Sequence, residues 1–351
     1  SQGGYQKTSY DQARLTGQAS AEIKGHAIKV GFEFEQRQER FWAVGNRALW
    51  QYMRQLTNRH LSGINQDPNS WELVMVNGQF QDTVHAPAFF EESDQSVFDR
   101  NLRNVLGLPM GGSDFIVVDN LDPSILNLRM FSADELLNDG NQYVNYYGYN
   151  FAGEKTKRVA AEDFFTDKQN RPMNAFAPTY ISGFIQDKFE LEDIIFNVGV
   201  RIDRFDANQK VLKDPFVLFP TYTAGEAKAL GYNVNDGIPD NWVPYMDDAT
   251  DPSQDGVLGY RDPEANIWYD ANGTPVSSAA LRSGGEVQPF LKDDEISIES
   301  FKDYTPQVIV MPRLSFSFPI SGEAVFFAHY DVLAQRPGQT GAGSGSALAG
   351  Q

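Results

Sequence analysis

Three stretches of the chain alternate between apolar and polar positions, and this period of two predicts β-strands with one apolar and one largely polar face. In the clearest stretch the apolar face carries Ile194, Phe196, Val198, Val200 and Ile202. The other face carries Ile195, Asn197, Gly199, Arg201 and Asp203. A weaker alternation at 179–189 precedes this strand after a short polar connection, so 179–206 is predicted to form a long β-hairpin.

The same alternation predicts two further hairpins, at 9–37 and 307–335. The turn of the first lies at Lys24-Gly25-His26, where glycine adopts the dihedral angles that a tight turn requires. The returning strand of this hairpin has an apolar face made by Ile28, Val30, Phe32 and Phe34. The two strands of the hairpin at 307–335 have apolar faces made by Leu314, Phe316 and Phe318, and by Ala324, Phe326, Ala328, Tyr330 and Val332.

Two long inserts separate the three predicted hairpins, at 40–178 and 207–305. The first insert contains helix signals. One is a set of apolar residues at helical spacing, and the other is a capping-box pattern from Ser132 to Glu135. The apolar set is Leu49, Tyr52, Met53 and Leu56. The tail at 338–351 is rich in Gly and Ser and is predicted to be a flexible linker.

Short turns at one end of the hairpins and long connections at the other are typical of outer-membrane β-barrels. Strands of roughly ten residues also suit a tilted crossing of a bilayer. The predicted fold class is therefore all-β: part of a large antiparallel transmembrane barrel, with about six strands, three hairpins and extracellular inserts that contain short helices. Because such barrels need at least about eight strands, we expect residues 1–351 to form a segment of one larger barrel domain.

Two hairpin motifs carry a resemblance to a known family. The stretch YISGFIQDKFELEDIIFNVGVRIDRFD resembles a barrel hairpin of TonB-dependent outer-membrane receptors, in which a Q-D strand precedes an N-x-G-x-R-x-D strand. PRLSFSFPISGEAVFFAHYDVLAQRP resembles the P-R-x-x-x-x-[FY]-P hairpin that follows in that family. FSADELLNDGNQYVNYYGYNFAGEK is similar to an extracellular loop of the large Oar-like subgroup. The family's energy-coupling box, plug domain and closing strand have no counterpart in these residues.

The resemblance implies an outer-membrane location, ligand capture by extracellular loops and energised import through the barrel. It implies that Arg201, Asp203 and Arg313 face the lumen. The residues alone favour an ordinary cross-strand ion pair on a wet wall for Arg201 and Asp203, and the same alternative applies to Arg313. The implied partners are the remainder of the same barrel and its plug, the inner-membrane TonB energy-coupling system and outer-membrane lipid. Surface lipoproteins or other outer-membrane proteins are further candidate partners.

Composition and charge narrow the range of possible partners and activities. The net charge of −18 argues against nucleic acid as a partner, because phosphate binding needs a basic surface. With no cysteine, the chain has no disulfide framework and no thiolate nucleophile or metal ligand. The four histidines show no metal-ligand spacing, and no nucleophile–base motif is present, so we do not expect an enzyme.

The stretch DPSQDGVLGYRD, residues 251–262, follows the spacing of a calcium-binding loop. Gly256 stands at the sixth position, where the sharp turn requires it. The predicted structural Ca²⁺ ligands, at positions 1, 3, 5, 7 and 12, are Asp251, Ser253, Asp255, the Val257 carbonyl and Asp262. An acidic loop held by Asx-turns explains the same residues about equally well.

A second interpretation of the whole chain stays open, because a soluble β-sandwich also alternates. In it the protein is a soluble calcium-dependent β-rich adhesin or glycan-binding module. Tryptophans in the inserts would then stack on sugars. These tryptophans are Trp42, Trp50, Trp71, Trp242 and Trp268.

Overall fold

The structure is a computed structural model that describes residues 4–61, 63–64, 69–85, 88–89, 94–282 and 287–334. These residues fall into two compact units, 4–10 with 39–175 and 11–38 with 176–334. The predicted tail at 338–351 lies outside the described residues.

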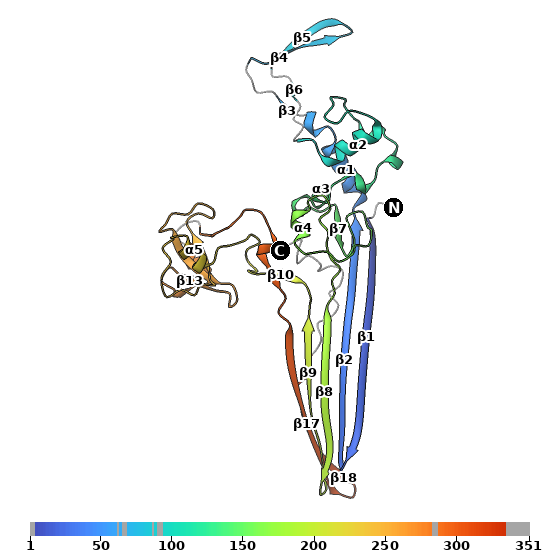
Figure 1. Cartoon of the computed structure of the whole chain (residues 1–351), viewed down its shortest axis with the longest axis vertical. Coiled ribbons are helices and arrows are strands. Elements are labelled where there is room, and N and C mark those ends of the chain that lie inside the picture. The colour runs from blue at the N-terminus through green and yellow to red at the C-terminus, as the bar shows by residue number, and fades with distance from the viewer. Residues whose placement is uncertain are drawn as a thin grey trace. The chain divides into compact units, whose positions relative to one another are not determined.

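Six long strands form the main sheet, in the order β1-β2-β8-β9-β17-β18 (Figure 1). The pairs from β2 to β18 are antiparallel. The antiparallel, β-rich class predicted from the sequence is therefore confirmed. Among the described residues β1 and β18 are the edge strands, and the sheet does not close into a barrel. The strands are β1 (Tyr5–Ile23), β2 (His26–Val44), β8 (Thr179–Leu191), β9 (Ile194–Asp206), β17 (Gln307–Ser321) and β18 (Ala324–Asp331).

Short turns link the strands of each hairpin, as the alternation predicts. Lys24 and Gly25 both adopt positive φ, at 50° and 89°, which is the backbone of a type I′ turn. Strand β2 runs further than the predicted boundary near 37, because its last residues pair with the short strand β7 (Val144–Tyr147). At the opposite edge of the sheet, β18 ends at Asp331, before the predicted boundary at 335.

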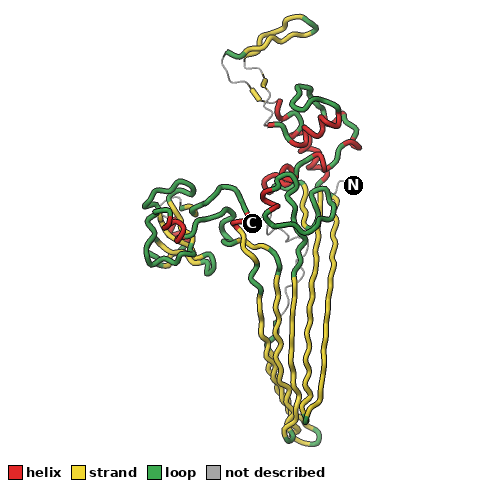
Figure 2. Tube along the Cα trace, viewed as in Figure 1, coloured by secondary structure: helices red, strands yellow, loops and turns green. Residues whose placement is uncertain are grey.

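The unit that contains 39–175 is built from short helices and loops around one core (Figure 2). Its first helix, α1, buries the four apolar residues predicted from their helical spacing. The predicted capping box is present, since the Ser132 hydroxyl accepts from the Glu135 N–H at 3.1 Å and the Glu135 carboxylate accepts from the Ser132 N–H at 2.9 Å. Its helices are α1 (Asn46–Leu56), α2 (Val97–Leu106), α3 (Ala133–Leu137) and α4 (Asp163–Thr166), and its other short strands are β3 (Gly63–Ile64), β4 (Trp71–Val76), β5 (Gln79–His85) and β6 (Ala88–Phe89). Its 3₁₀ turns are η1 (Arg59–Leu61), η3 (Val118–Asn120), η4 (Pro123–Ile125), η5 (Leu128–Met130) and η6 (Asn138–Gly140).

The second insert belongs to the other unit and carries a small sheet in the order β14-β13-β12-β11-β15. Tyr260 and Met246 are fully buried in its core, beside Phe290. Its elements are β10 (Lys210–Leu212), α5 (Ala224–Ala229), β11 (Val243–Met246), β12 (Val257–Asp262), β13 (Ile267–Asp270), β14 (Pro275–Val276), α6 (Ser278–Arg282), β15 (Gln288–Pro289), η7 (Ile298–Ser300) and β16 (Phe301–Asp303).

Candidate functional site on the polar face of the main sheet

The register of the main sheet assigns its side chains to two faces, because residues directly opposite each other share a face. One row on the apolar face runs through Phe32, Gly183, Ile202 and Val310. The neighbouring row on the polar face runs through Glu33, Ser182, Asp203 and Ile309. Each strand from β2 to β17 thus contributes to both faces, and most of their apolar positions lie on the same face, with Asp187 and Arg204 as exceptions.

The exposure of the two faces is the reverse of that in a water-soluble sheet. Side chains on the apolar face are between 37% and 59% exposed: Val30, Phe32, Phe34, Ile181, Ile185, Val198, Ile202, Val308, Val310 and Leu314. On the polar face Glu35 is 3%, Ser182 3% and Tyr180 5% exposed. In this part of the polar face the side chains shield one another, whereas Lys29, Lys188 and Arg313 on the same face are exposed.

Arg201 is the centre of a hydrogen-bond network on the polar face. Its Nε donates to Asp203 Oδ1 at 2.7 Å, and its second terminal nitrogen donates to the Tyr180 and Ser182 hydroxyls, each at 2.9 Å. The Tyr180 hydroxyl in turn donates to the other oxygen of Asp203. Glu33 lies 3.7 Å from the Arg201 guanidinium. Arg201 and Asp203, predicted to share one face, do so here and are paired.

The network extends towards β1 through a second set of ion pairs. Arg14 on β1 contacts Glu33 at 2.9 Å and Glu35 at 4.0 Å. Glu35 also accepts from Arg37 at 2.7 Å. These carboxylates are nearly buried, so arginines and not solvent compensate their charge. Such charge-assisted hydrogen bonds favour fixed positions for the side chains on the polar face.

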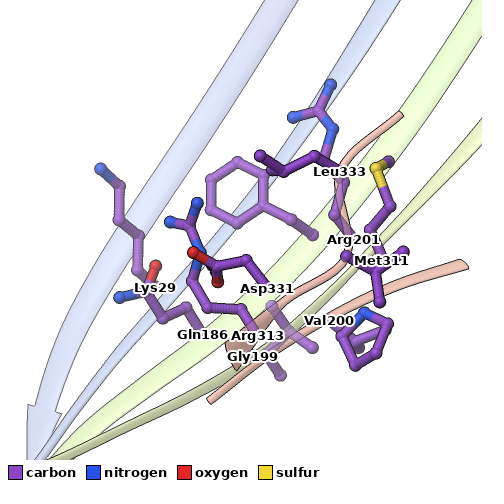
Figure 3. Close-up of a pocket in the computed structure, with 13 residues that line it drawn as sticks. Lys29, Gln186, Gly199, Val200, Arg201, Met311, Arg313, Asp331 and Leu333 are labelled. Carbon is purple, nitrogen blue, oxygen red and sulfur yellow. Dashed lines mark hydrogen bonds and ion pairs between the residues drawn. The ribbon is translucent and has the colours of Figure 1, made fainter. Parts of the chain in front are cut away.

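Arg313 lies on the same face but belongs to a different set of contacts from the Arg201 network. Its Nε donates to Asp331 Oδ1 at 2.9 Å, directly across the β17–β18 pair. The row through Lys29, Gln186, Gly199, Arg313 and Asp331 crosses five strands. A pocket of about 270 Å³ opens over this row and is also lined by Phe184, Arg201, Met311 and Leu333 (Figure 3). It combines cationic side chains with an apolar wall.

Aromatic rings mark one level on the apolar face, near the short turns. Phe189 stacks on Phe196 with ring centroids 5.3 Å apart, and Phe196 lies 6.3 Å from Phe316. The row continues to His26, whose ring centroid is 5.2 Å from that of Phe189. Four successive strands, β2, β8, β9 and β17, contribute a ring to this row.

The residues predicted to bind calcium lie in the second insert and are not gathered around one point. Val257 and Asp262 are the two ends of the extended strand β12, which pairs on both sides and separates them by about 16 Å. Asp262 accepts from the backbone N–H groups of Glu264 and Ala265. Within the described residues, His, Cys, Asp and Glu form no group of three or more that could hold a metal. Residues 251–262 therefore do not wrap around one point as a calcium-binding loop of this spacing would. Calcium binding stays a prediction.

The acidic turn between β11 and β12 is instead held by its own carboxylates. Asp247 accepts from the Ser253 hydroxyl at 2.6 Å, which lowers the pKa of Asp247. Asp248 accepts from the Asp251 N–H at 3.0 Å, and this bond lowers its pKa. A Cβ at Gly256 would lie 2.1 Å from Asp247 Oδ1, so a side chain at this position would displace the Asp247 carboxylate. Asp255 accepts from the Asn233 amide at 3.1 Å.

The tryptophans that a glycan-binding module would use have different environments. Trp42 is 4% exposed and donates to the Phe151 carbonyl, so it belongs to the core. Trp50 donates to Asp119, and Trp242 stacks on Tyr269 with ring centroids 3.9 Å apart. Trp71, on β4, is 60% exposed.

No protein-family model, curated protein or solved structure matches this chain. Across the described ranges, no helix is long and apolar enough to cross a membrane. The case for a function therefore depends on the geometry of the sheet and on the sequence motifs.

Sequence reasoning named Arg201, Asp203 and Arg313 but missed the residues that hold them. The alternation predicts the strand that carries Tyr180 and Ser182 but gives these residues no role, and it does not predict the pairing of Glu33 with Arg14. Part of this information was present in the sequence, because Glu33 and Glu35 are the polar positions that alternate with Phe32 and Phe34. Which polar residue meets which depends on register across strands that are far apart in the sequence.

Proposed function

We propose that this chain is a barrel segment of an outer-membrane TonB-dependent receptor, in which extracellular inserts capture a ligand and the barrel passes it inward with energy from the inner membrane. The observation that carries the proposal is the main sheet, whose apolar face is exposed while the cluster around Glu35, Ser182 and Tyr180 on its polar face is buried. An apolar side chain left in water forgoes about 1.5–3 kcal/mol relative to burial. A whole face of such side chains suits lipid and does not suit water.

The extent of the apolar face supports the same proposal. On β2 it runs from His26 to Phe34, eight positions or about 26 Å along the strand, comparable with the ~25 Å apolar band of outer-membrane barrels. At one border lies the aromatic row, as in the girdles of such barrels. At the other border Arg204 occupies the row of Phe34 and pairs with Asp206.

In this proposal the polar face lines the lumen. Arg201, Asp203 and Arg313 then belong to a wall of fixed ion pairs, against which the plug and the passing ligand move. The long inserts lie on the extracellular side and the tight turns on the periplasmic side. The edge strands β1 and β18 pair with further strands of the same barrel, since open edges do not occur in the hydrocarbon region.

The test uses two adjacent residues of β2 that point to opposite faces. These 351 residues contain no cysteine. Val30→Cys and Lys29→Cys each carry a single environment-sensitive fluorophore in the complete receptor in bilayers, after any cysteine elsewhere in it is replaced by serine. We expect the label at Val30 to be quenched by brominated lipid and the label at Lys29 to be quenched by aqueous iodide. Equal aqueous quenching at both sites contradicts the proposal and favours the soluble adhesin.

A further inference from the structure

The pocket on the polar face joins a row of charged side chains to a row that contains apolar ones (Figure 3). The two rows follow each other along the strands, two residues or about 7 Å apart. A ligand in this pocket can therefore contact charged and apolar groups at the same time. The charged row contains Lys29, Arg313 and Asp331, and the apolar side chains of the next row are Phe184 and Met311.

Two cations of the charged row are available to a ligand. Lys29 is exposed and forms no ion pair with the part of the chain that the structure describes. Arg313 uses only its Nε in the bond to Asp331, and its two terminal nitrogens donate to none of the described residues. The Arg313 side chain is 54% exposed. The free edge of this guanidinium can therefore donate to both oxygens of one carboxylate.

The charges that line the pocket match a ligand with a single negative charge. Lys29 and Arg313 contribute two positive charges and Asp331 contributes one negative charge, which leaves one positive charge in excess. Arg201 adds nothing to this excess, because its guanidinium is paired with Asp203. A phosphate dianion would exceed the positive charge and would also be repelled by Asp331. The pocket is thus better suited to a carboxylate.

The remaining walls suit a flat apolar group. Gly199 lies in the middle of the charged row, on β9, and the lack of a side chain leaves the wall open there down to the backbone. Phe184 and Met311 lie on β8 and β17, the two strands that flank β9. An aromatic ring over Gly199 can therefore contact the Phe184 ring on one side and the Met311 thioether on the other, and both contacts are favourable.

We propose that this pocket is a binding site for an aromatic carboxylate. The carboxylate accepts hydrogen bonds from the two terminal nitrogens of Arg313, Lys29 attracts the same charge from β2, and the ring lies over Gly199. The proposal rests on the proposed function in one respect, since it is the receptor that places this pocket on an import path. There it selects the class of compound that passes.

The test is a titration of the complete receptor in detergent with a fluorinated benzoate, followed through the fluorine NMR signal of the ligand. We expect saturable binding by the wild type. The corresponding fluorinated benzamide has the same ring without the charge and should bind about tenfold more weakly, the size of one charge-assisted hydrogen bond. Arg313→Gln should raise the Kd for the benzoate by about the same factor. Arg313→Lys should recover only part of the loss, because lysine has no planar fork.

Two further variants keep the test independent of folding defects. Asp331→Asn should lower the Kd about threefold, because it removes a repelling charge, and a gain in affinity cannot come from misfolding. Lys29→Gln should raise the Kd about threefold. Lys188→Gln is its matched control, since both lysines are exposed on the polar face but only Lys29 lines the pocket.

The results separate this proposal from the one it rests on. Lack of saturable binding by the wild type, or equal binding of benzoate and benzamide, overturns the pocket site. Equal losses in Lys188→Gln and Lys29→Gln overturn it too, as does an Asp331→Asn variant that binds no more tightly than the wild type. The quenching of labels at Lys29 and Val30 decides the receptor proposal separately. Aqueous quenching at both positions, together with saturable benzoate binding, would overturn the receptor and leave the pocket site in place.

Discussion

At the scale of single residues, the compact unit that contains 39–175 depends on a buried arginine. Arg103 on α2 is completely buried, and its Nε donates to Asp99 Oδ2 at 2.8 Å. It also donates to the Asp114 carbonyl at 2.8 Å and to Asn58 Oδ1 at 3.2 Å. Asn58 in turn pairs with both backbone groups of Ile116. One guanidinium thus fixes the helix, the turn after α1 and the loop before Ile116.

Replacing Arg103 by Met should destabilise this unit strongly. The Asp99 carboxylate would stay buried without its cation, a change that costs about 3–5 kcal/mol. Chemical denaturation of the protein, followed through fluorescence of the tryptophans in this unit, measures the loss. Arg54→Met is the matched control, because Arg54 pairs with Asp119 at the surface and each side chain is about half exposed. Equal losses in the two variants would contradict the structural role given to Arg103.

The i, i+4 spacing of Asp99 and Arg103 was visible in the sequence, but their burial was not. The same spacing is common on exposed helix faces, where such pairs contribute little. Burial is decided by residues outside α2, above all Asn58 and the backbone of Asp114. Sequence patterns could therefore not identify this pair as important.

At the scale of elements, the predictions that depended on local pattern agree with the structure best. The period of two located long strands at the three expected positions, because alternation is a property of each strand alone. It also assigned Arg201 and Val200 correctly to opposite faces of β9. Pairings between distant segments were missed, such as that of Trp42 with Tyr146, which extends β2 into the insert. A short strand such as β7 has no periodic signal of its own.

The turn between β11 and β12 gives an element-scale prediction. Asp247→Ala removes both acceptors of the Ser253 bonds, so proteolysis between Asp236 and Asp270 should accelerate equally in calcium and in chelator. Asp255→Ala should have a smaller effect. If chelator alone exposes the wild-type segment, and Asp255→Ala does the same in calcium, the calcium-loop hypothesis is supported against the carboxylate-held turn.

The same turn should respond to acid. Hydrogen bonds lower the pKa of Asp247 and of Asp248 below the ordinary value of 3.8. A carboxylate with a depressed folded-state pKa contributes stability that is complete above its unfolded pKa and is lost as pH falls through the folded value. Hydrogen exchange of the Ser253 and Asp251 amides, corrected for intrinsic rates, should therefore show protection at neutral pH and loss of protection well below pH 3.8. Unchanged protection in that acidic range would contradict this account.

At the scale of the whole molecule, the net charge of −18 does not make the chain soluble by itself. The charged side chains of the main sheet lie largely on one face, and the other face exposes apolar groups next to the edge strands β1 and β18. Charge that is segregated in this way leaves an apolar surface and open backbone groups available to other chains.

The 351-residue chain should therefore associate in plain buffer, and detergent should reduce this association without giving a single species, because it covers the apolar face but leaves the edge strands unpaired. Sedimentation in both solvents tests this directly. A monomer that unfolds cooperatively without detergent would argue against both the lipid-facing sheet and the missing neighbours of its edge strands.

The pairing of β2 with β7 has a consequence for the order of folding. Gln36 and Thr179 pair across 143 positions of chain, a long loop to close by diffusion. Within the insert, however, Val44 pairs with Val144, and Arg40 and Ala175 both lie against Gly148. An insert that folds first brings its own two ends together and shortens the effective loop to a few residues. Each halving of a loop lowers the closure cost by about 0.6 kcal/mol, so prior folding contributes about 3 kcal/mol. Pairing of β2 with β8 then starts next to the folded insert and proceeds along the two strands. The hairpins form after this pairing.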